Sequence, residues 1–183
     1  MARAFDGIDE VLNGWLAAQH VFFVATAPRA DDGRINLSPK GLEGTFAVLD
    51  RHTVAYLDLT GSGIETVAHL RENGRIVVMF CAFEGPPRIV RLHGRGEAVI
   101  PDDSRFASLV AHFPEHPGVR SVVVVEVTGV TDSCGFGVPI LRFDDERTKL
   151  DEWAARKGPD GVADYQRTRN AESIDGLPGL VSG

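Results

Sequence analysis

Closely spaced strand-like runs, separated by tight turns, dominate residues 20–131 and constrain the fold more than any other feature of the sequence. The runs "HVFFVATA" and "RINLS" flank the turn signal "DDGR", and we expect Pro39 to end the second run. "GTFAVLD" and "TVAYLDL" follow, and after one helical stretch come "RIVVMFCAFE" and "RIVRLHGRGEAVI", which we expect to pair as a hairpin. A last run is "RSVVVVEVTGVTD". Strands this close together, interrupted by few helices, favour a small antiparallel β-barrel over alternating βαβ units.

Helical patterns flank the predicted barrel. "FDGIDEVLNGWLAAQ" has apolar residues at helical spacing behind an acidic start, which predicts a helical N-terminus at about residues 6–18. We expect a further short helix through "SRFASLVAHF", ended by Pro114. "ERTKLDEWAARKG" and "GVADYQRTRN" predict two helical stretches within a helical and irregular extension at about residues 140–183. No repeat or linker divides the chain, so we expect its 183 residues to form one domain, with the barrel at about residues 20–131.

The charge and the composition exclude several classes of function. A net charge of -7 argues against nucleic acid, which is bound by basic surfaces. The N-terminus lacks an apolar leader segment and no run is long enough to span a bilayer, so we expect a cytoplasmic protein without a membrane partner. His112 and His116 have a metal-ligand spacing, but Pro114 breaks the helix that this spacing needs, so we expect no metal site.

The glycine-rich corner in "TGSGIET" has two interpretations. Ser62 and Glu65 have the spacing of a capping box, in which each side chain bonds a free backbone N–H at the start of a helix. The glycines on both sides of Ser62 instead favour a close approach of the backbone to another body, and a helix start offers N–H groups to an anion. The corner is therefore either a helix cap or a phosphate cradle.

Polar and basic side chains share one face of each of two predicted strands, because alternate residues of a strand point to the same side. These residues are Arg91, His93 and Arg95 in "RIVRLHGR", and Arg34, Asn36 and Ser38 in "RINLSPK", with Lys40 following Pro39. Such faces on an acidic protein are explained by solvated surface and ion pairs, or by an anionic cofactor lying across the barrel.

The ordered segments "VFFVATA", "DGRINLSPKG", "TVAYLDLTGSGIETVAHLRENGRIVVMF" and "PPRIVRLHGRGEAV" resemble the pyridoxamine 5′-phosphate oxidase-like family over about residues 18–131. The resemblance implies an FMN-binding antiparallel split β-barrel, mainly β with flanking helices. It also implies a homodimer that holds two flavin mononucleotides (FMN) at the subunit interface.

The same resemblance carries cofactor contacts onto this sequence but no catalytic side chain. The implied FMN contacts are Arg34, Ser38, Lys40, Ser62, Thr66, Arg91 and Arg95, with backbone N–H groups of Gly61 and Gly63 assisting. Where the family commonly shows Ser-Arg-Lys or a lone Lys at the helix start, this chain has Ile64, Glu65 and Thr66. The C-terminal Arg and Trp pattern of true pyridoxamine-phosphate oxidases is not evident in "SIDGLPGLVSG".

The resemblance implies a flavin-dependent oxidoreductase that acts on a small organic molecule and is not a true pyridoxamine-phosphate oxidase. One alternative is a reductase that uses a deazaflavin coenzyme, since the base at the helix start is replaced. A second is a flavin-binding or flavin-storing dimer without turnover. In a third, the corner is only a helix cap and the barrel binds no cofactor.

Overall fold

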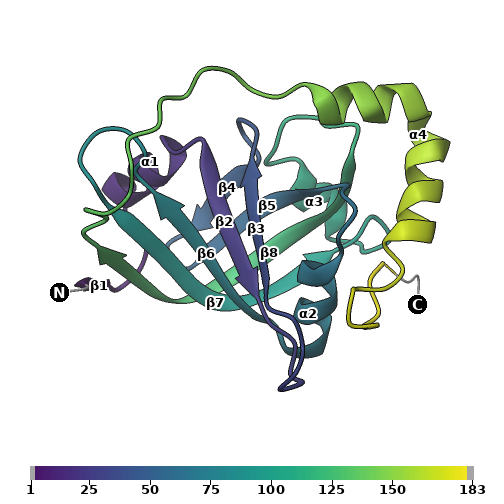
Figure 1. The fold of residues 1–183 in the computed structure, drawn as a ribbon, viewed down its shortest axis with the longest axis horizontal. Helices are drawn as coiled ribbons and strands as arrows, with labels where there is room; N and C mark the ends of the chain where they lie inside the picture. Colours follow the sequence, from purple (N-terminus) through teal and green to yellow (C-terminus); the bar gives the residue numbers. More distant parts are fainter. Residues whose placement is uncertain (1–2, 181–183) are drawn as a thin grey trace.

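The computed structural model describes residues 3–180, within which eight strands form one antiparallel sheet and four helices lie around it (Figure 1). The strands are β1 (Arg3–Phe5), β2 (Val21–Thr26), β3 (Asn36–Gly41), β4 (Phe46–Asp50), β5 (Thr53–Leu59), β6 (Arg75–Cys81), β7 (Ile89–Val99) and β8 (Val119–Ser133). The helices are α1 (Glu10–Ala17), α2 (Glu65–Asn73), α3 (Phe106–Val110) and α4 (Lys149–Arg169).

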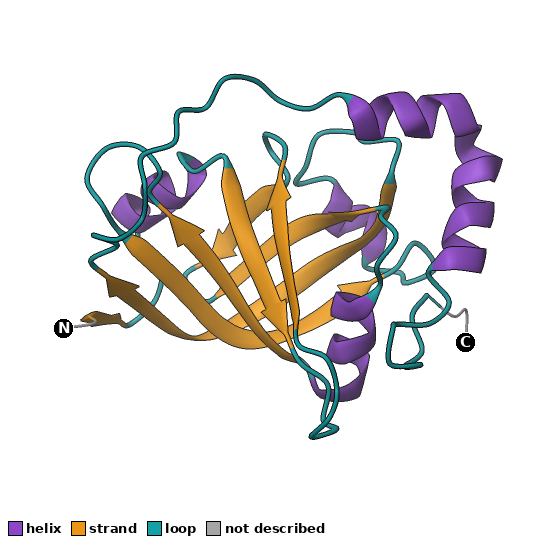
Figure 2. Cartoon of the chain, in the orientation of Figure 1, coloured by secondary structure: helices purple, strands orange, loops and turns teal. Residues whose placement is uncertain are grey.

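The sheet curls into a barrel whose seam lies between its two edges, with β3 on one side and β4 and its neighbour β5 on the other. Its strand order is β3-β2-β6-β7-β8-β5-β4, with β1 paired to β8. β3 and β4 lie at the two ends of this order, yet only residues 42–45 join them in the chain. So short a connection requires the two edges of the sheet to approach each other. Figure 2 shows the strands of the sheet curling round into a barrel.

The barrel interior is filled by the inward-facing residues of alternating strands. On β2, buried residues alternate with half-buried ones, so that Phe22 and Val24 point inward. The ring of Phe22 packs against Phe46, Tyr56 and Phe80, with centroid distances of 5.4–5.5 Å. A smaller cluster on the other side of β5 and β8 packs against α3. This rigid interior fixes the positions of the polar residues along the seam.

Most expected elements are found in the structure, with differences at their ends. The hairpin of β6 and β7 and the turn between β2 and β3 are confirmed. α4 joins the two predicted helical stretches and bends at Gly158, which has a φ of 68°. The prediction that Pro39 ends its strand is wrong, because β3 continues to Gly41; proline is tolerated there since β3 is an edge strand.

Two other elements differ from the sequence prediction. α3 is shorter than predicted, because residues 100–105 form turns in which the Asp103 carboxylate accepts a hydrogen bond from the Arg105 N–H (2.9 Å). The short β1 was not predicted. The last three residues of the predicted C-terminal extension lie outside the described residues. No helix within residues 3–180 combines the length and the apolar character needed to cross a membrane.

Candidate functional site

A buried carboxylate joins the two sides of the barrel seam. Asp58 on β5 is fully buried and accepts a hydrogen bond from Arg120 Nε on β8 at 2.6 Å. Lys40 Nζ, near the end of β3, donates to the other carboxylate oxygen of Asp58 at 3.2 Å. Ser121 Oγ donates to Asp58 as well, also at 3.2 Å. The buried charge is therefore compensated on several sides, as burial requires.

The two cations keep the buried carboxyl ionised. Burial alone would raise the pKa of Asp58, but the charges of Lys40 and Arg120 and their hydrogen bonds outweigh it, so its pKa lies below the ordinary value. Tyr56, the preceding inward-facing residue of β5, has its pKa raised well above the usual range, first by burial and then by the charge of Asp58. The seam thus contains a fixed negative charge at neutral pH that is neutralised locally.

Arg120 also holds the glycine-rich corner, residues 60–66. Its Nη1 donates to the carbonyl oxygen of Gly63 at 2.7 Å and to Asn170 Oδ1 at 3.2 Å. Asn170, the fully buried residue that follows α4, donates through Nδ2 to the carbonyl oxygen of Gly61 at 3.0 Å. Because two corner carbonyls are turned toward these donors, the corner has a fixed conformation that depends on β8 and on the C-terminal part of the chain.

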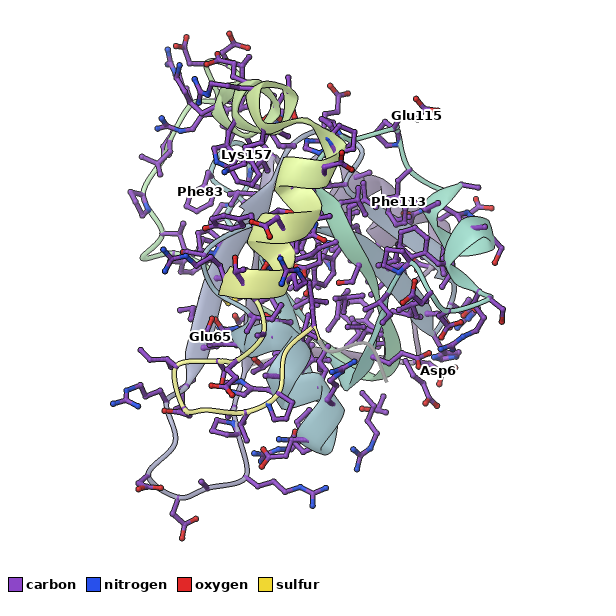
Figure 3. The ribbon with its side chains drawn as sticks, turned by 90° about the vertical axis from the view of Figure 1, so that its right-hand side faces the viewer. Asp6, Glu65, Phe83, Phe113, Glu115 and Lys157 are labelled. Atoms are coloured by element: carbon purple, nitrogen blue, oxygen red, sulfur yellow. The ribbon has the colours of Figure 1, made fainter. Side chains whose placement is uncertain are left out.

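Of the two interpretations of the corner, the capping box of Ser62 and Glu65 is wrong. α2 has Ile64 at its N-cap, and no side chain among residues 3–180 caps the helix. Ser62 is exposed, and the Glu65 carboxylate accepts a hydrogen bond from the Ile174 N–H at 3.2 Å. Figure 3 shows Glu65 beside the C-terminal loop, residues 170–180. The backbone N–H groups of the first turn of α2 are therefore not used by a side-chain cap.

The two corner glycines differ in their surroundings. A Cβ at Gly63 would lie 2.4 Å from Glu65 Oε2, so glycine at this position gives room to the glutamate side chain. At Gly61 a Cβ would meet nothing within 4 Å. The structure therefore explains Gly63 by an internal contact, whereas the Cβ side of Gly61 faces open space.

A chain of hydrogen bonds connects β3 to α2. Asn36 Nδ2 donates to Thr26 Oγ1 at 3.1 Å and to Thr66 Oγ1 at 3.0 Å. Ser38 Oγ donates to Asn36 Oδ1 at 2.9 Å, and Thr26 Oγ1 lies 2.9 Å from Nδ1 of His69. Asn36, Ser38 and Lys40 share one face of β3, and this face runs about 13 Å from α2 toward the barrel end at Lys40, given the rise per residue of a strand.

His69 on α2 lies at the inner end of this chain. The ring is fully buried, and its Nε2 has no hydrogen-bond partner within the described part of the chain. Burial lowers the pKa of His69, while the carboxylates of Glu65, Asp175 and Glu72 oppose the shift. A neutral imidazole beside the first turn of α2 is therefore expected at neutral pH.

The four predicted basic residues occupy four separate places, and Lys40 is the one at the seam. Arg34 pairs with Asp175 of the C-terminal loop through both its side chain and its backbone N–H. Arg95 Nη1 donates to the carbonyl oxygen of Asn73, at the end of α2 opposite the corner. Arg91 lies on the outer face of the sheet and donates to Ser133 Oγ at 3.2 Å. Within one chain, Lys40, Ser38 and Thr66 are connected through the seam, whereas Arg91 and Arg95 are not.

A cavity of about 950 Å³ opens at the end of the seam marked by Pro39 and Lys40. It lies under an extended segment, residues 134–148, which we call the strap and which crosses over the barrel toward α4 (Figure 1). The polar face of β3 thus leads from α2 at one end to this cavity at the other. Within residues 3–180, no three His, Cys, Asp or Glu side chains gather where they could hold a metal ion.

Sequence reasoning missed three residues of this site, namely Asp58, Arg120 and Asn170. The first two carry a signal, because each is a charged residue within or beside an apolar strand run, and a buried charge needs a partner. Asn170 carries no such signal, since it lies 109 residues beyond the corner residue that it contacts.

The curled antiparallel sheet with its polar seam defines an antiparallel split β-barrel, the fold class that the sequence predicted. The chain belongs to the pyridoxamine 5′-phosphate oxidase family, whose model, described as "Pyridoxamine 5'-phosphate oxidase", matches residues 8–134. It is similar to the "Pyridoxamine 5'-phosphate oxidase family protein ustO" of Aspergillus flavus, with 41% identity over 197 residues, which cover 97% of this chain and 78% of that protein.

The solved structures that are similar include two of HupZ from Group A Streptococcus. A structure of a HupZ variant has a TM-score of 0.53 and 19% identity, and the match covers 69% of this chain and 99% of that one. A second HupZ structure has a TM-score of 0.51 and 20% identity, covering 67% of this chain and 91% of that one. At this level of identity the likeness shows the fold alone.

Proposed function

We propose that this protein binds FMN and works as a flavin-dependent oxidoreductase on a small organic molecule. The observation that carries the proposal is the polar face of β3, which connects the uncapped first turn of α2 with the cavity at Lys40. Membership of the family named after pyridoxamine 5′-phosphate oxidase supports a redox function, as does the family name of the Aspergillus relative.

The residues around the start of α2 fit a phosphate monoester. Ser62 offers an exposed hydroxyl, and Thr66 offers the hydroxyl proton that its bond from Asn36 leaves free. The first-turn N–H groups and the positive end of the helix dipole favour an anion. The Glu65 carboxylate would repel a phosphate, but its hydrogen bond to the Ile174 N–H directs it toward the C-terminal loop.

The chemistry would be the cofactor's, and the protein would bind and orient it. A bound flavin supplies electron or hydride transfer to an organic molecule. Ser62 and Thr66 would hold the phosphate, while Ser38 and Lys40 would lie along the ring system toward the cavity. Because Lys40 is already paired with Asp58, it would offer the ring a hydrogen-bond donor within a neutralised pair.

A homodimer is part of the proposal, because it would use the outer face of the sheet. Ile35 and Leu37 are 78% and 64% exposed. On the outer face, the apolar residues Pro39, Phe23 and Met79 form one row across β3, β2 and β6. This row ends at Arg91 of β7. An apolar row on an antiparallel sheet is typical of a face covered by another copy or partner. In such a dimer Arg91 and Arg95 would contribute to the partner's cofactor, which accounts for their separation from the seam of their own chain.

Titration of the flavin-free protein with FMN, followed by quenching of flavin fluorescence, tests the proposal. The Ser62→Ala variant is expected to bind FMN about tenfold more weakly, through loss of one charge-assisted hydrogen bond. Ser104→Ala removes an exposed serine between β7 and α3 and is the matched control. Failure of the unsubstituted protein to bind FMN would refute the proposal. If a deazaflavin coenzyme binds more tightly than FMN in parallel titrations, the deazaflavin coenzyme would be assigned as the cofactor in place of FMN.

Three further measurements test the dimer, the sharing of each site between two chains, and the catalytic assignment. Sedimentation or light scattering should give the mass of a dimer, and mixing Arg91→Gln with Ser62→Ala chains should restore part of the FMN affinity if each site combines two chains. Reduction of the bound flavin followed by exposure to oxygen separates an enzyme from a storage protein. Slow reduction and slow reoxidation would contradict the catalytic assignment.

A further inference from the structure

The cavity under the strap has mainly aromatic and aliphatic walls. Trp15 and His20 come from α1 and the turn that follows it, and Phe83 comes from the loop after β6. Leu57 and Leu59 of β5 line it as well, and so does Leu141 of the strap. At about 950 Å³ the cavity lies near the upper end of the range of about 300–1000 Å³ that is typical of sites for drug-sized ligands.

Few contacts hold the strap over the cavity. The N–H of Leu141 donates to the carbonyl oxygen of Phe83 at 3.1 Å, and Figure 3 shows Phe83 on the side of the barrel where the strap runs. The ring of Phe143 stacks on His20 with a centroid distance of 3.8 Å and an angle of 8° between the planes. This stacked pair places flat aromatic surface at the cavity wall, and the strap residues on either side of Phe143 are exposed.

The charges around the cavity do not select an anion. Lys40 is the half-buried cation of the lining, and its ammonium group is paired with Asp58 at 3.2 Å. The other charged lining residues lie on the strap or on the loop after β6, and their signs nearly balance. They are Arg142, Arg147, Glu84, Asp145 and Glu146. A phosphate ester entering this cavity would lose hydration without meeting a buried unpaired base.

We propose that the cavity under the strap binds an uncharged aromatic organic molecule and excludes a phosphate group from its interior. Flat apolar walls reward burial of a ring, at about 25 cal/mol for each Å² of apolar surface removed from water. Naming this molecule as the substrate rests on the proposed flavin function, because Pro39 and Lys40 belong both to the cavity lining and to the strand along which the flavin would lie. The occupancy of the cavity by such a molecule does not depend on the flavin.

Two fluorescent probes with the same rings test the preference directly. N-phenyl-1-naphthylamine is uncharged, and 8-anilino-1-naphthalenesulfonate carries one negative charge. We expect saturable binding of the uncharged probe, with an affinity about tenfold or more above that of the sulfonate, because the charge is not compensated in the cavity. Equal or tighter binding of the sulfonate, or no binding of the uncharged probe, would overturn the proposal.

Paired variants locate the bound probe. Leu141→Asp puts a charge into the lining and is expected to weaken binding of the uncharged probe about tenfold. Ile140→Asp changes the neighbouring strap residue, which is 78% exposed and does not line the cavity, and should leave binding unchanged. Energy transfer from tryptophan to the probe should fall more in Trp15→Phe than in Trp153→Phe, because Trp15 lines the cavity and Trp153 does not. The reverse pattern, or equal effects of the two aspartates, would place the probe elsewhere and refute the proposal.

The same titrations separate this proposal from the proposed function. They are made first on protein without flavin and then on protein exposed to excess FMN. Probe binding in a protein that takes up no FMN would uphold the cavity assignment while the flavin function fails. FMN binding in a protein that fails the probe tests would uphold the flavin function and refute the cavity assignment.

Discussion

Replacing Arg120 with methionine is expected to destabilise the whole barrel, because this arginine is the main partner of a buried carboxylate. Removing one member of a buried ion pair typically costs about 3–5 kcal/mol. Lys40 would remain 3.2 Å from Asp58, so we expect a loss near the lower end, about 3 kcal/mol. The carbonyl oxygen of Gly63 would also lose its 2.7 Å donor, so the corner should loosen along with the seam.

Guanidinium unfolding followed by circular dichroism measures this loss, with the m-value showing whether the transition stays cooperative. Adding Asp58→Asn to the Arg120→Met variant removes the stranded charge and should recover part of the lost free energy of unfolding. Arg105→Met is the matched surface control, since Arg105 pairs with Glu97 and Asp103 in exposed positions and should cost far less. Equal losses for Arg120→Met and Arg105→Met would refute the assignment of the buried network.

The pH dependence of stability gives an independent check on Asp58. The pKa of this carboxyl is lower in the folded protein than in the unfolded chain, so its contribution is present above the unfolded pKa of about 4. The contribution is lost as the pH falls from that value through the lower folded pKa. The free energy of unfolding should therefore fall less steeply below about pH 4 in Asp58→Asn than in the unsubstituted protein.

Three further substitutions have expected outcomes that denaturant unfolding can check. Phe80→Ala should cost about 3–5 kcal/mol, since the ring is 1% exposed and packs among other aromatic rings; a loss below about 1 kcal/mol would contradict this packing. Gly94→Ala should cost about 1–3 kcal/mol or more, because its Cβ would lie 2.2 Å from the carbonyl oxygen of Glu126; unchanged stability would refute the close approach. Ser62→Ala should change stability by less than about 0.5 kcal/mol, whereas loss of a helix cap would cost about 1 kcal/mol.

The strands and their pairing could be predicted from the sequence because their signals are local. The turn before β3 and the hairpin of β6 and β7 each depend on neighbouring residues. β2 differs, because its run "VFFVAT" is apolar on both faces and does not by itself specify which side faces the core. The shared face of Asn36 and Ser38 was also predictable, since it follows from the two-residue period of a strand. The place of Lys40 on this face was not, because the strand was expected to end at Pro39.

The conformation of the corner could not be predicted, because distant residues decide it. The spacing of Ser62 and Glu65 satisfies the capping rule. In the structure, however, Arg120 and Asn170 donate hydrogen bonds to the corner carbonyls. The Glu65 carboxylate accepts a hydrogen bond from the Ile174 N–H instead of capping the helix. A local rule is overridden when buried donors from other elements offer a better arrangement. The same limit applies to the cavity, whose walls come from α1, β3, β5 and the strap.

The visible spectrum of the purified protein, together with the mass of any small molecule released on denaturation, tests the central claim most directly. Bound or readily rebound FMN, with the absorption bands of a flavin, is the result that we predict. A colourless protein that takes up neither FMN nor a deazaflavin coenzyme would contradict the claim that the face of β3 between α2 and Lys40 is a cofactor site.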